Sequence, residues 1–484
     1  MAAQLILGLS ILVFIHELGH FFFARLFKTR VEQFYLFFNP KISLFRAKKI
    51  NGKWKFRLFS KNVPAGFRKK TDANGNDIKD EKGKEIYEPI PIEELHKDDW
   101  RKYPDSTEWG IGWLPFGGYC NIAGMIDENK RANQLSSEPQ SWELRSKPAW
   151  QRLLVMLGGI IMNLILGCVL FVFFTYHYVG GYIANDDVAK NGIYAYDAGK
   201  QLGFETGDKI VAVNGKKIVR FDDVRKTGVY FGSKITVERN GQIFDIELPD
   251  TTYRILQRSG SLFSNSNFPA IVDSVAPNTP AQRGGMQKDD HIISINDVAI
   301  NCFGAIQGEL RKHTREEITV GVVRQQDTLQ LTMQLDSMPV LGFTSKIPYV
   351  PVHYTIGESF KYGISDAMDM LSVNVKGLGK VLKGQEKATE SLQGPIGIAS
   401  IYGGIWDWSH FWFITAILSL VLAFMNILPI PALDGGHIVF ILIEIVTGRK
   451  PSDRAIEYAQ IAGMMILIAL MFFVIGNDIF RLFR

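Results

Sequence analysis

Two histidines and a glutamate near the start of the sequence have the types and spacing for metal chemistry. His16 and His20 are four residues apart, so on a helix their imidazoles project from one face. That spacing lets two ring nitrogens hold one zinc ion, and Glu17 stands beside them as a candidate general base. The pattern predicts a zinc site with an adjacent proton acceptor.

The motif lies inside an apolar run from about Leu5 to Phe23. Ionisable groups at bilayer depth cost roughly 2.5–3.5 kcal/mol each on insertion scales and are functional by default. A signal peptide would begin with basic residues, whereas Met1-Ala2-Ala3-Gln4 is uncharged. A soluble core helix is the other alternative, but a helix apolar on nearly all sides is typical of a membrane span. We therefore expect residues 1–27 to form a transmembrane helix.

Composition narrows the class of protein. The chain has 484 residues, of which 46% are hydrophobic and 21% charged, so it is long enough for several domains. The net charge of +5 is too small and dispersed to favour nucleic acid as a partner. Only Cys120, Cys168 and Cys302 occur, far apart, which excludes a disulfide framework and a cysteine zinc cluster. A metal must then be held by histidine and carboxylate.

Three further apolar blocks, at residues 151–178, 409–446 and 456–480, are long enough to cross a bilayer. Basic residues gather in the loop 28–150 and after the third block, and the positive-inside rule places both loops in the cytoplasm. The sequence thus predicts an α-helical multi-pass membrane protein with four transmembrane helices. In the second span, Asn163 is expected to bond across to a neighbouring helix.

The third block is interrupted by prolines and glycines between residues 426 and 437. Irregular backbone at membrane depth is tolerated only around a buried site or cavity. Asp434 is the only acid between Asp407 and Glu444, and a zinc ion with two histidines needs a third ligand that leaves one position for water. His437 is the rival ligand, and helix capping is the structural alternative for Asp434.

Two stretches between the first and second spans contain turn residues. The glycine-rich segment 113–124 favours a bent strand or membrane-associated hairpin over a helix, the alternative being an ordinary hairpin packed on the cytoplasmic loop. Residues 48–110 are charged and turn-rich and read as a surface insertion or hairpin-containing loop.

The region between the second and third spans contains an internal repeat. Gly203–Ile218 and Gly285–Ile300 each show a turn, an alternating strand, a second turn and a new strand. We expect two β-rich domains at 185–258 and 262–348 that resemble PDZ domains, whose groove binds an extended peptide by strand addition. The alternative is a steric filter with empty grooves. Residues 355–405 follow as an amphipathic helix and connector.

The two separated motifs and the inserted repeat together resemble one family. His16-Glu17-Leu18-Gly19-His20 in the first span, Leu433-Asp434-Gly435 in the third and two PDZ-like domains between are similar to the site-2 proteases of the regulator-of-sigma-E protease type. These are intramembrane zinc metalloproteases. The resemblance implies that His16, His20 and Asp434 bind Zn²⁺ and that Glu17 is the general base for attack by zinc-activated water.

The resemblance also implies residues that bind substrate. Gly117, Gly118 and Tyr119 are similar to the family's membrane-dipping β-hairpin, which pairs with an unwound substrate. Asn426 corresponds to a residue that holds the substrate backbone, and Asn163 is placed in the same group.

The implied activity is hydrolysis of peptide bonds in or near transmembrane segments. The expected substrates are pre-trimmed single-span membrane proteins, such as anti-sigma factors, or signal-peptide remnants. The expected location is the bacterial cytoplasmic (inner) membrane, with the PDZ-like domains on the extracytoplasmic side; the sequence does not indicate an oligomer. The alternatives are a catalytically silent membrane adaptor that binds peptide termini, and a metal transporter, which would need ionisable residues along several spans.

Overall fold

The chain, seen in a computed structural model, forms two compact units. The first comprises residues 1–174, 362–371 and 392–484, and the second comprises residues 175–361 and 372–391. The structure describes residues 2–61, 67–69, 87–89, 94–95, 99–115, 117–125, 139–230, 232–259, 262–313, 315–336, 339–384, 389, 394–403 and 406–482. The turn-rich parts of the insertion 48–110, including 72–75 and 81–84, lie outside these residues.

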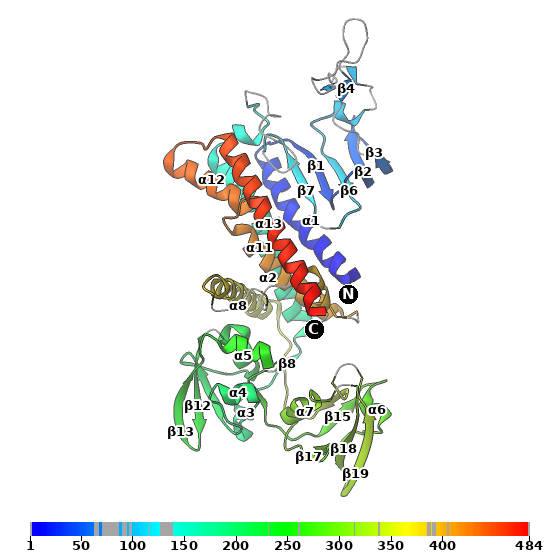
Figure 1. Cartoon of the computed structure of the whole chain (residues 1–484), viewed down its shortest axis with the longest axis vertical. Coiled ribbons are helices and arrows are strands. Elements are labelled where there is room, and N and C mark those ends of the chain that lie inside the picture. Colours follow the sequence, from blue (N-terminus) through cyan, green and yellow to red (C-terminus); the bar gives the residue numbers. More distant parts are fainter. Residues whose placement is uncertain are drawn as a thin grey trace. The chain divides into compact units, whose positions relative to one another are not determined.

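Four helices of the first unit are long and apolar enough to cross a membrane, as the sequence predicts. They are α1 (Ala2–Leu26), α2 (Ala149–Tyr178), α11 (Trp408–Ile427) and α13 (Asp453–Leu482). Figure 1 shows them running alongside one another. The third apolar block, expected over 409–446, consists of α11 and a separate helix, α12 (Asp434–Thr447).

Backbone chemistry separates α11 from α12. Pro429 and Pro431 have no N–H to donate to a helix, and Ala432 adopts a positive φ of 78°. A side chain at Gly435 would lie 2.0 Å from the Leu428 carbonyl oxygen, so only glycine permits the chain to turn back this tightly. The turn leaves Asp434 in the first turn of α12.

Two glycines let α1 and α2 touch through their backbones. A Cβ atom on Gly19 would lie 2.1 Å from the carbonyl oxygen of Gly158, and one on Gly158 would lie 2.5 Å from that of Gly19. Small residues at a crossing permit this close approach in membrane helices. The contact fixes the height of α2 against the centre of the α1 motif.

A five-stranded sheet packs beside α1, in the order β3-β2-β6-β1-β7 (Figure 1). Its strands are β1 (Val31–Leu36), β2 (Ile42–Ile50), β3 (Lys53–Lys61), β6 (Glu108–Ile111) and β7 (Tyr119–Ile122). β1 runs parallel to β6, and the other pairs are antiparallel. The described part of the 48–110 insertion therefore supplies strands β3 and β6 of this sheet.

In the segment 113–124, for which the sequence predicts a bent strand or a hairpin, the described residues contain one strand, β7. β6 and β7 do not pair with each other among the described residues; they flank β1 on opposite sides. The chain between them must cross the end of β1, and Gly118 passes so close to Tyr35 that a Cβ atom would lie 2.6 Å from its carbonyl oxygen. The glycines allow the loop to cross β1 at close range. Sequence reasoning had assigned them to a bent strand or a hairpin.

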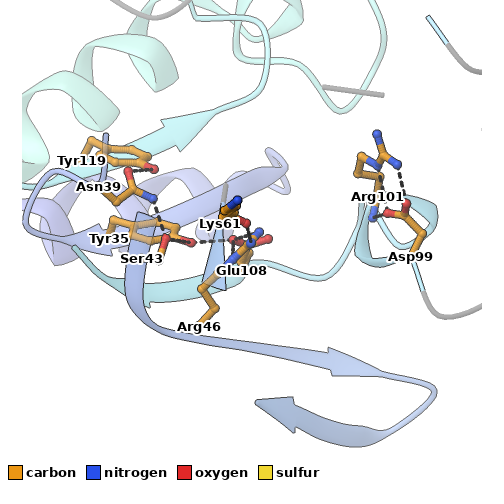
Figure 2. A network of polar contacts seen from close by, with 9 residues as sticks. All are labelled: Tyr35, Asn39, Ser43, Arg46, Lys61, Asp99, Arg101, Glu108 and Tyr119. Carbon is orange, nitrogen blue, oxygen red and sulfur yellow. Dashed lines mark hydrogen bonds and ion pairs between the residues drawn. The ribbon is translucent and has the colours of Figure 1, made fainter. Parts of the chain in front are cut away.

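A buried polar network crosses the sheet (Figure 2). Its centre is Glu108, whose Oε1 accepts hydrogen bonds from Tyr35 Oη at 2.6 Å and Arg46 Nε at 2.8 Å. At the β7 end, Tyr119 Oη donates to Asn39 Oδ1 at 3.0 Å, and the Tyr119 ring stacks on Tyr35 at 5.2 Å. A fully partnered buried network fixes one strand register. Its members are Tyr35, Asn39, Ser43, Arg46, Glu108 and Tyr119.

The second unit contains two sheets of the same topology. The first has the order β11-β10-β12-β13 and the second β17-β16-β18-β19, and each covers its own apolar core. The strands are β10 (Lys209–Val213), β11 (Lys216–Lys217), β12 (Lys234–Arg239), β13 (Gln242–Glu247), β16 (His291–Ile295), β17 (Val298–Ala299), β18 (Glu317–Arg324) and β19 (Asp327–Gln334).

One ion pair recurs in both copies. Arg239 Nε lies 2.6 Å from the buried Asp208, and Arg239 also donates to the Gly203 carbonyl. In the second copy Arg324 Nε lies 2.7 Å from Asp290 in the same way. The repeated contact supports an internal duplication; the PDZ-like identity of the copies, and their domain boundaries, stay predictions.

The remaining elements connect these parts. α8 (Ile356–Leu382) begins at Thr355 with a capping box, and α10 (Pro395–Ile401) precedes α11. The other helices and strands are β4 (Phe67–Lys69), β5 (Tyr87–Pro89), β8 (Gly181–Tyr182), α3 (Asn185–Asn191), β9 (Ile193–Ala195), α4 (Asp197–Gln201), α5 (Thr252–Ser259), β14 (Ser264–Ser266), β15 (Val272–Val275), α6 (Pro280–Arg283), α7 (Phe303–Leu310), β20 (Phe343–Ser345) and β21 (Val350–Pro351).

Candidate metal centre

The two histidines of α1 converge as their spacing predicts. His16 Nε2 and His20 Nε2 lie 3.3 Å apart, with the rings nearly perpendicular at 84°. Both side chains are largely enclosed, 12% and 9% exposed. When both Nε2 atoms are unprotonated, their lone pairs face each other at this separation and repel. A cation bound between them removes the repulsion, so the arrangement favours a metal ion.

Asp434 completes a triangle of ligand atoms. Its Oδ2 lies 3.2 Å from His16 Nε2 and 3.3 Å from His20 Nε2. The edges of a zinc tetrahedron with ligand distances of about 2.0–2.1 Å measure about 3.3–3.4 Å, so the three atoms have the spacing of three of its corners. Asp434 Oδ2 is buried and makes no hydrogen bond. An orphaned carboxylate oxygen facing two imidazole nitrogens fits a metal ion.

His20 is held by a second contact on its other nitrogen. His20 Nδ1 lies 2.8 Å from the carbonyl oxygen of Val155 on α2. A carbonyl can only accept, so Nδ1 carries the proton and the Nε2 lone pair is directed at the ligand triangle. The backbone of α2 thus fixes the tautomer of His20.

Asn163 plays the matching role for His16. Its side-chain amide lies 3.1 Å from His16 Nδ1, and its Oδ1 is a buried atom without a hydrogen-bond partner. The oxygen and nitrogen of an amide are assigned from their hydrogen bonds. Turning the amide by 180° lets Oδ1 accept from His16 Nδ1–H, which partners both atoms and directs Nε2 at the triangle.

Gly159 leaves room for the histidine rings. A Cβ atom there would lie 2.5 Å from His16 Cε1 and 2.6 Å from His20 Nε2. Together with the Gly19–Gly158 crossing, this shows why α2 carries two adjacent glycines at the height of the site. Sequence reasoning did not assign Gly159 or the Val155 carbonyl to the site; the available signal was that Gly159 lies four residues before Asn163, on the same helix face.

Glu17 lies beside the three ligand atoms. Its carboxylate interacts electrostatically with His20, His16 and Asp434, and the backbone N–H of Cys120 on β7 is directed at it. β7 is the last strand of its sheet. The structure therefore brings the candidate base and a strand edge to the same place.

The other predicted residues fall into two groups. Asn426 is buried in the last turn of α11, with Nδ2 3.4 Å from His16 Nε2. Gly118 lies against Val13 of α1, where a Cβ atom would be 2.8 Å from Val13 Cγ1. The Tyr119 side chain is engaged in the sheet network instead.

The rival ligand His437 lies apart from the triangle. Its Nε2 is 2.8 Å from Gln460 Nε2 on α13. Among the described residues, the group of histidine, cysteine and carboxylate side chains that could hold a metal ion consists of His16, His20 and Asp434.

Comparison with known proteins assigns the chain to a family. The model of peptidase family M50 matches residues 4–78 and 97–470. The regulator of sigma-E protease RseP of Escherichia coli is 25% identical over 518 aligned residues, with 99% of this chain and 98% of that protein covered. The protease RseP of Yersinia pestis is 24% identical, with the same coverage.

A protein of Vibrio cholerae that is named as a candidate zinc metalloprotease is 25% identical, again across 99% of this chain. The predicted resemblance is confirmed over nearly the whole length, and zinc is the cofactor of the family. The chain therefore belongs to peptidase family M50 and is a zinc metalloprotease of the site-2 type.

Proposed function

We propose that this protein hydrolyses peptide bonds in or beside the transmembrane segments of membrane proteins. His16, His20 and Asp434 would hold the zinc ion, and Glu17 would be the general base. The observation that carries the assignment is the triangle of three ligand atoms, with edges of 3.2–3.3 Å, next to a glutamate on the same helix. Bound zinc supplies Lewis-acid polarisation and lowers the pKa of water toward neutrality.

Different residues of the chain would transfer the proton, orient the histidines and bind the substrate carbonyl. Glu17 takes a proton from the attacking water and delivers it to the leaving nitrogen, as an acid–base group on the same side of the scissile bond can do. Asn163 and the Val155 carbonyl hold the imidazoles in one tautomer. The Asn426 amide would donate a hydrogen bond to a substrate carbonyl, and its contact with His16 Nε2 at 3.4 Å supports this role.

The substrate would bind as an added strand. A helical segment has its carbonyls bonded internally, so it must unwind before attack. The edge of β7 offers replacement hydrogen bonds beside Glu17. Gly117 and Gly118 belong to the crossing loop that leads into this edge, and Tyr119 anchors the strand to the sheet network.

The native thiol of Cys120 tests this binding mode. We would replace Cys168 and Cys302 by serine and scan single cysteines through a model substrate for disulfide cross-linking to Cys120. Strand pairing predicts strong cross-links at every second substrate position. A spacing of three to four would show that the substrate binds as a helix and would contradict strand addition.

The proposed substrates are single-span membrane proteins already trimmed on one side, with anti-sigma factors or signal-peptide remnants as the class that the family resemblance implies. We place the protein in the bacterial cytoplasmic membrane with the duplicated domains outside; the basic residues after α1 and α12 support this orientation. The test is cleavage of one substrate with and without a folded outer domain.

The catalytic assignment is tested by Glu17→Gln in the full chain. The variant should keep zinc at the wild-type ratio and lose cleavage of a single-span substrate by at least about 100-fold, the contribution of a positioned general base. Wild-type cleavage by Glu17→Gln would defeat the assignment. Full binding of peptide termini with no hydrolysis by the wild type would favour the alternative, a catalytically silent adaptor.

A further inference from the structure

A groove of about 450 Å³ lies on the first unit between the end of α1 and the β2–β3 hairpin. Phe21 and Arg25 line it from α1, Lys49 and Trp54 from the hairpin, and Trp109 from β6. None of these residues contributes to the zinc site. The groove thus combines three aromatic rings with two cations and one carboxylate, that of Asp105.

Two of the three aromatic rings are in contact, and a buried ring extends that contact. Phe21 and Trp109 have ring centroids 5.0 Å apart, and Trp109 continues to Phe34 at 4.7 Å. Trp54 lies directly opposite Lys49 across the hairpin, so the two side chains project from the same face. The Trp54 side chain is half exposed. An exposed ring of this size beside a cation is typical of a binding surface.

The groove lies where α1 reaches the edge of the bilayer. The sheet contacts α1 as far down as Phe14, whose ring is 5.6 Å from that of Phe34. Phe14 is eleven residues before Arg25, or about 16 Å along a helix, which is half of a hydrocarbon core of about 30 Å. The sheet therefore lies alongside the span, and Arg25 marks the level of the headgroups.

The same sheet face continues outward as an apolar surface. Phe56 and Leu58 of β3 are 62% and 68% exposed, and both lie on the face that carries Trp54, since they alternate with it along the strand. On α1, Phe22, the residue after Phe21, is 56% exposed. Exposed apolar side chains of this size are typical of a surface that contacts a membrane or another protein.

The charges of the groove are positive on balance. Arg25 and Lys49 are exposed, and the described residues include no ion pair to either of them. Asp105 also lines the groove, but its carboxylate is paired with Arg30, whose guanidinium lies 2.6 Å from Asp105 Oδ1. The two cations suit the phosphate of a phospholipid, and the aromatic rings suit its acyl chain.

We propose that this groove binds an anionic phospholipid of the leaflet on the Arg25 side. Arg25 and Lys49 bind the phosphate, and Phe21, Trp54 and Trp109 line the path of one acyl chain. Occupancy by lipid fastens the β2–β3 hairpin to the membrane surface. Lipid binding in this groove does not require the hydrolytic site.

The test uses the full chain in micelles of an uncharged detergent, with tryptophan fluorescence as readout. Phosphatidylglycerol with brominated acyl chains should quench emission in a saturable manner, and phosphatidylcholine with the same chains should need a higher concentration. Trp54→Phe should remove a large part of the quenching. Arg25→Gln with Lys49→Gln should raise the half-saturating concentration by about 30-fold, because each basic residue near a charged headgroup changes binding by about fivefold.

Lys53→Gln is the matched control. Lys53 lies on the same hairpin but pairs with Ile50, so its side chain points to the opposite face from Lys49. Lys49→Gln alone should weaken binding about fivefold, and Lys53→Gln should leave it unchanged, with the same thermal unfolding for both variants. Equal effects of the two variants would show general charge attraction and overturn the proposal.

Three other results would also overturn it. Equal quenching by the two lipids would remove the role of the phosphate charge. Full displacement of the lipid by inorganic phosphate would make the groove a site for a free anion. If neither lipid quenches in a saturable manner, the groove does not bind phospholipid, and a protein partner remains as the occupant.

Discussion

The Asn163 side chain of α2 lies 3.1 Å from His16 Nδ1, the nitrogen that faces away from the candidate metal position. With its amide oxygen toward the ring, Asn163 accepts the Nδ1 proton and leaves Nε2 free as a ligand. The residue that sequence resemblance placed among the substrate-binding groups thus contacts a predicted metal ligand. We expect it to act on substrate only through His16.

This relationship predicts how Asn163 variants bind zinc. Asn163→Leu removes the acceptor at similar size, and it should weaken zinc binding by about 10–100-fold, the usual effect of losing a partner of a metal-bound histidine. Asn163→Asp retains an acceptor and should remain within a few-fold of wild type. Competition with a chelator measures both affinities. Equal losses in the two variants would contradict the positioning role.

Gly159 gives a steric test of the same site. Gly159→Ala places a methyl group 2.5–2.6 Å from the His16 and His20 rings, and the rings cannot both stay in the ligand triangle. We expect zinc affinity to fall by at least about 10-fold. Gly476→Ala on α13 is the control, because a Cβ atom there meets no described atom within 4 Å. A Gly159→Ala protein with normal zinc content would show that the triangle is not the binding site.

A third prediction concerns the contact between α10 and α13. Asp478, 3% exposed, accepts hydrogen bonds from the backbone N–H groups of Gly394, Ile396 and Gly397, each at 3.0 Å. Asp478→Asn turns an amide toward these donors and should cost about 3 kcal/mol. Amide hydrogen exchange in residues 394–401 should accelerate by about 100-fold.

Asp407 supplies the comparison for that variant. It caps α11 by accepting from Ser409 N at 2.8 Å but is exposed. Asp407→Asn should cost about 1 kcal/mol or less, and only at the start of α11. Unchanged exchange at 394–401 in Asp478→Asn would mean that α10 is held by apolar packing alone.

The sheet beside α1 should lose stability in alkali. Burial raises the pKa of Tyr119 to about 12 from an ordinary value near 10. Between these pH values the folded protein keeps the phenol proton and the unfolded chain has lost it, so the free energy of unfolding falls as pH rises. The loss is about 2 kcal/mol at pH 12, approaches about 3 kcal/mol above that pH, and is absent below pH 9.

Tyr119→Phe isolates this effect. The variant loses the hydrogen bond to Asn39 at every pH, but the part of the pH dependence that belongs to Tyr119 should vanish. The difference in tyrosinate absorbance between wild type and variant gives the pKa directly. A difference titration centred near pH 10 would contradict the burial of this phenol.

Local patterns were enough to predict several parts of the molecule. The four apolar helices follow from runs of hydrophobic residues, and the convergence of His16 and His20 follows from helical spacing. Asp434 could be singled out because few carboxylates occur at membrane depth. Each of these inferences needs information from one segment of the chain.

Long-range contacts could not be predicted in the same way. The order β3-β2-β6-β1-β7 pairs β1 with strands that follow it by more than 70 residues, and alternation within a strand does not name its neighbour. For this reason the sequence did not decide between a bent strand and a hairpin at 113–124, and it did not name β1 as the partner of β7. The tautomer contacts of His16 and His20 likewise depend on where α2 crosses α1, which the Gly19–Gly158 contact decides.

X-ray absorption at the zinc edge tests the central claim most directly. The zinc-loaded full chain should show nitrogen and oxygen neighbours at about 2.0–2.1 Å, with scattering from two imidazoles and none from sulfur near 2.3 Å. Asp434→Ala should lose the ion or replace one oxygen neighbour, and His437→Ala should leave the spectrum unchanged. A third imidazole that disappears in His437→Ala, or a zinc–sulfur distance in wild type, would contradict the site formed by His16, His20 and Asp434.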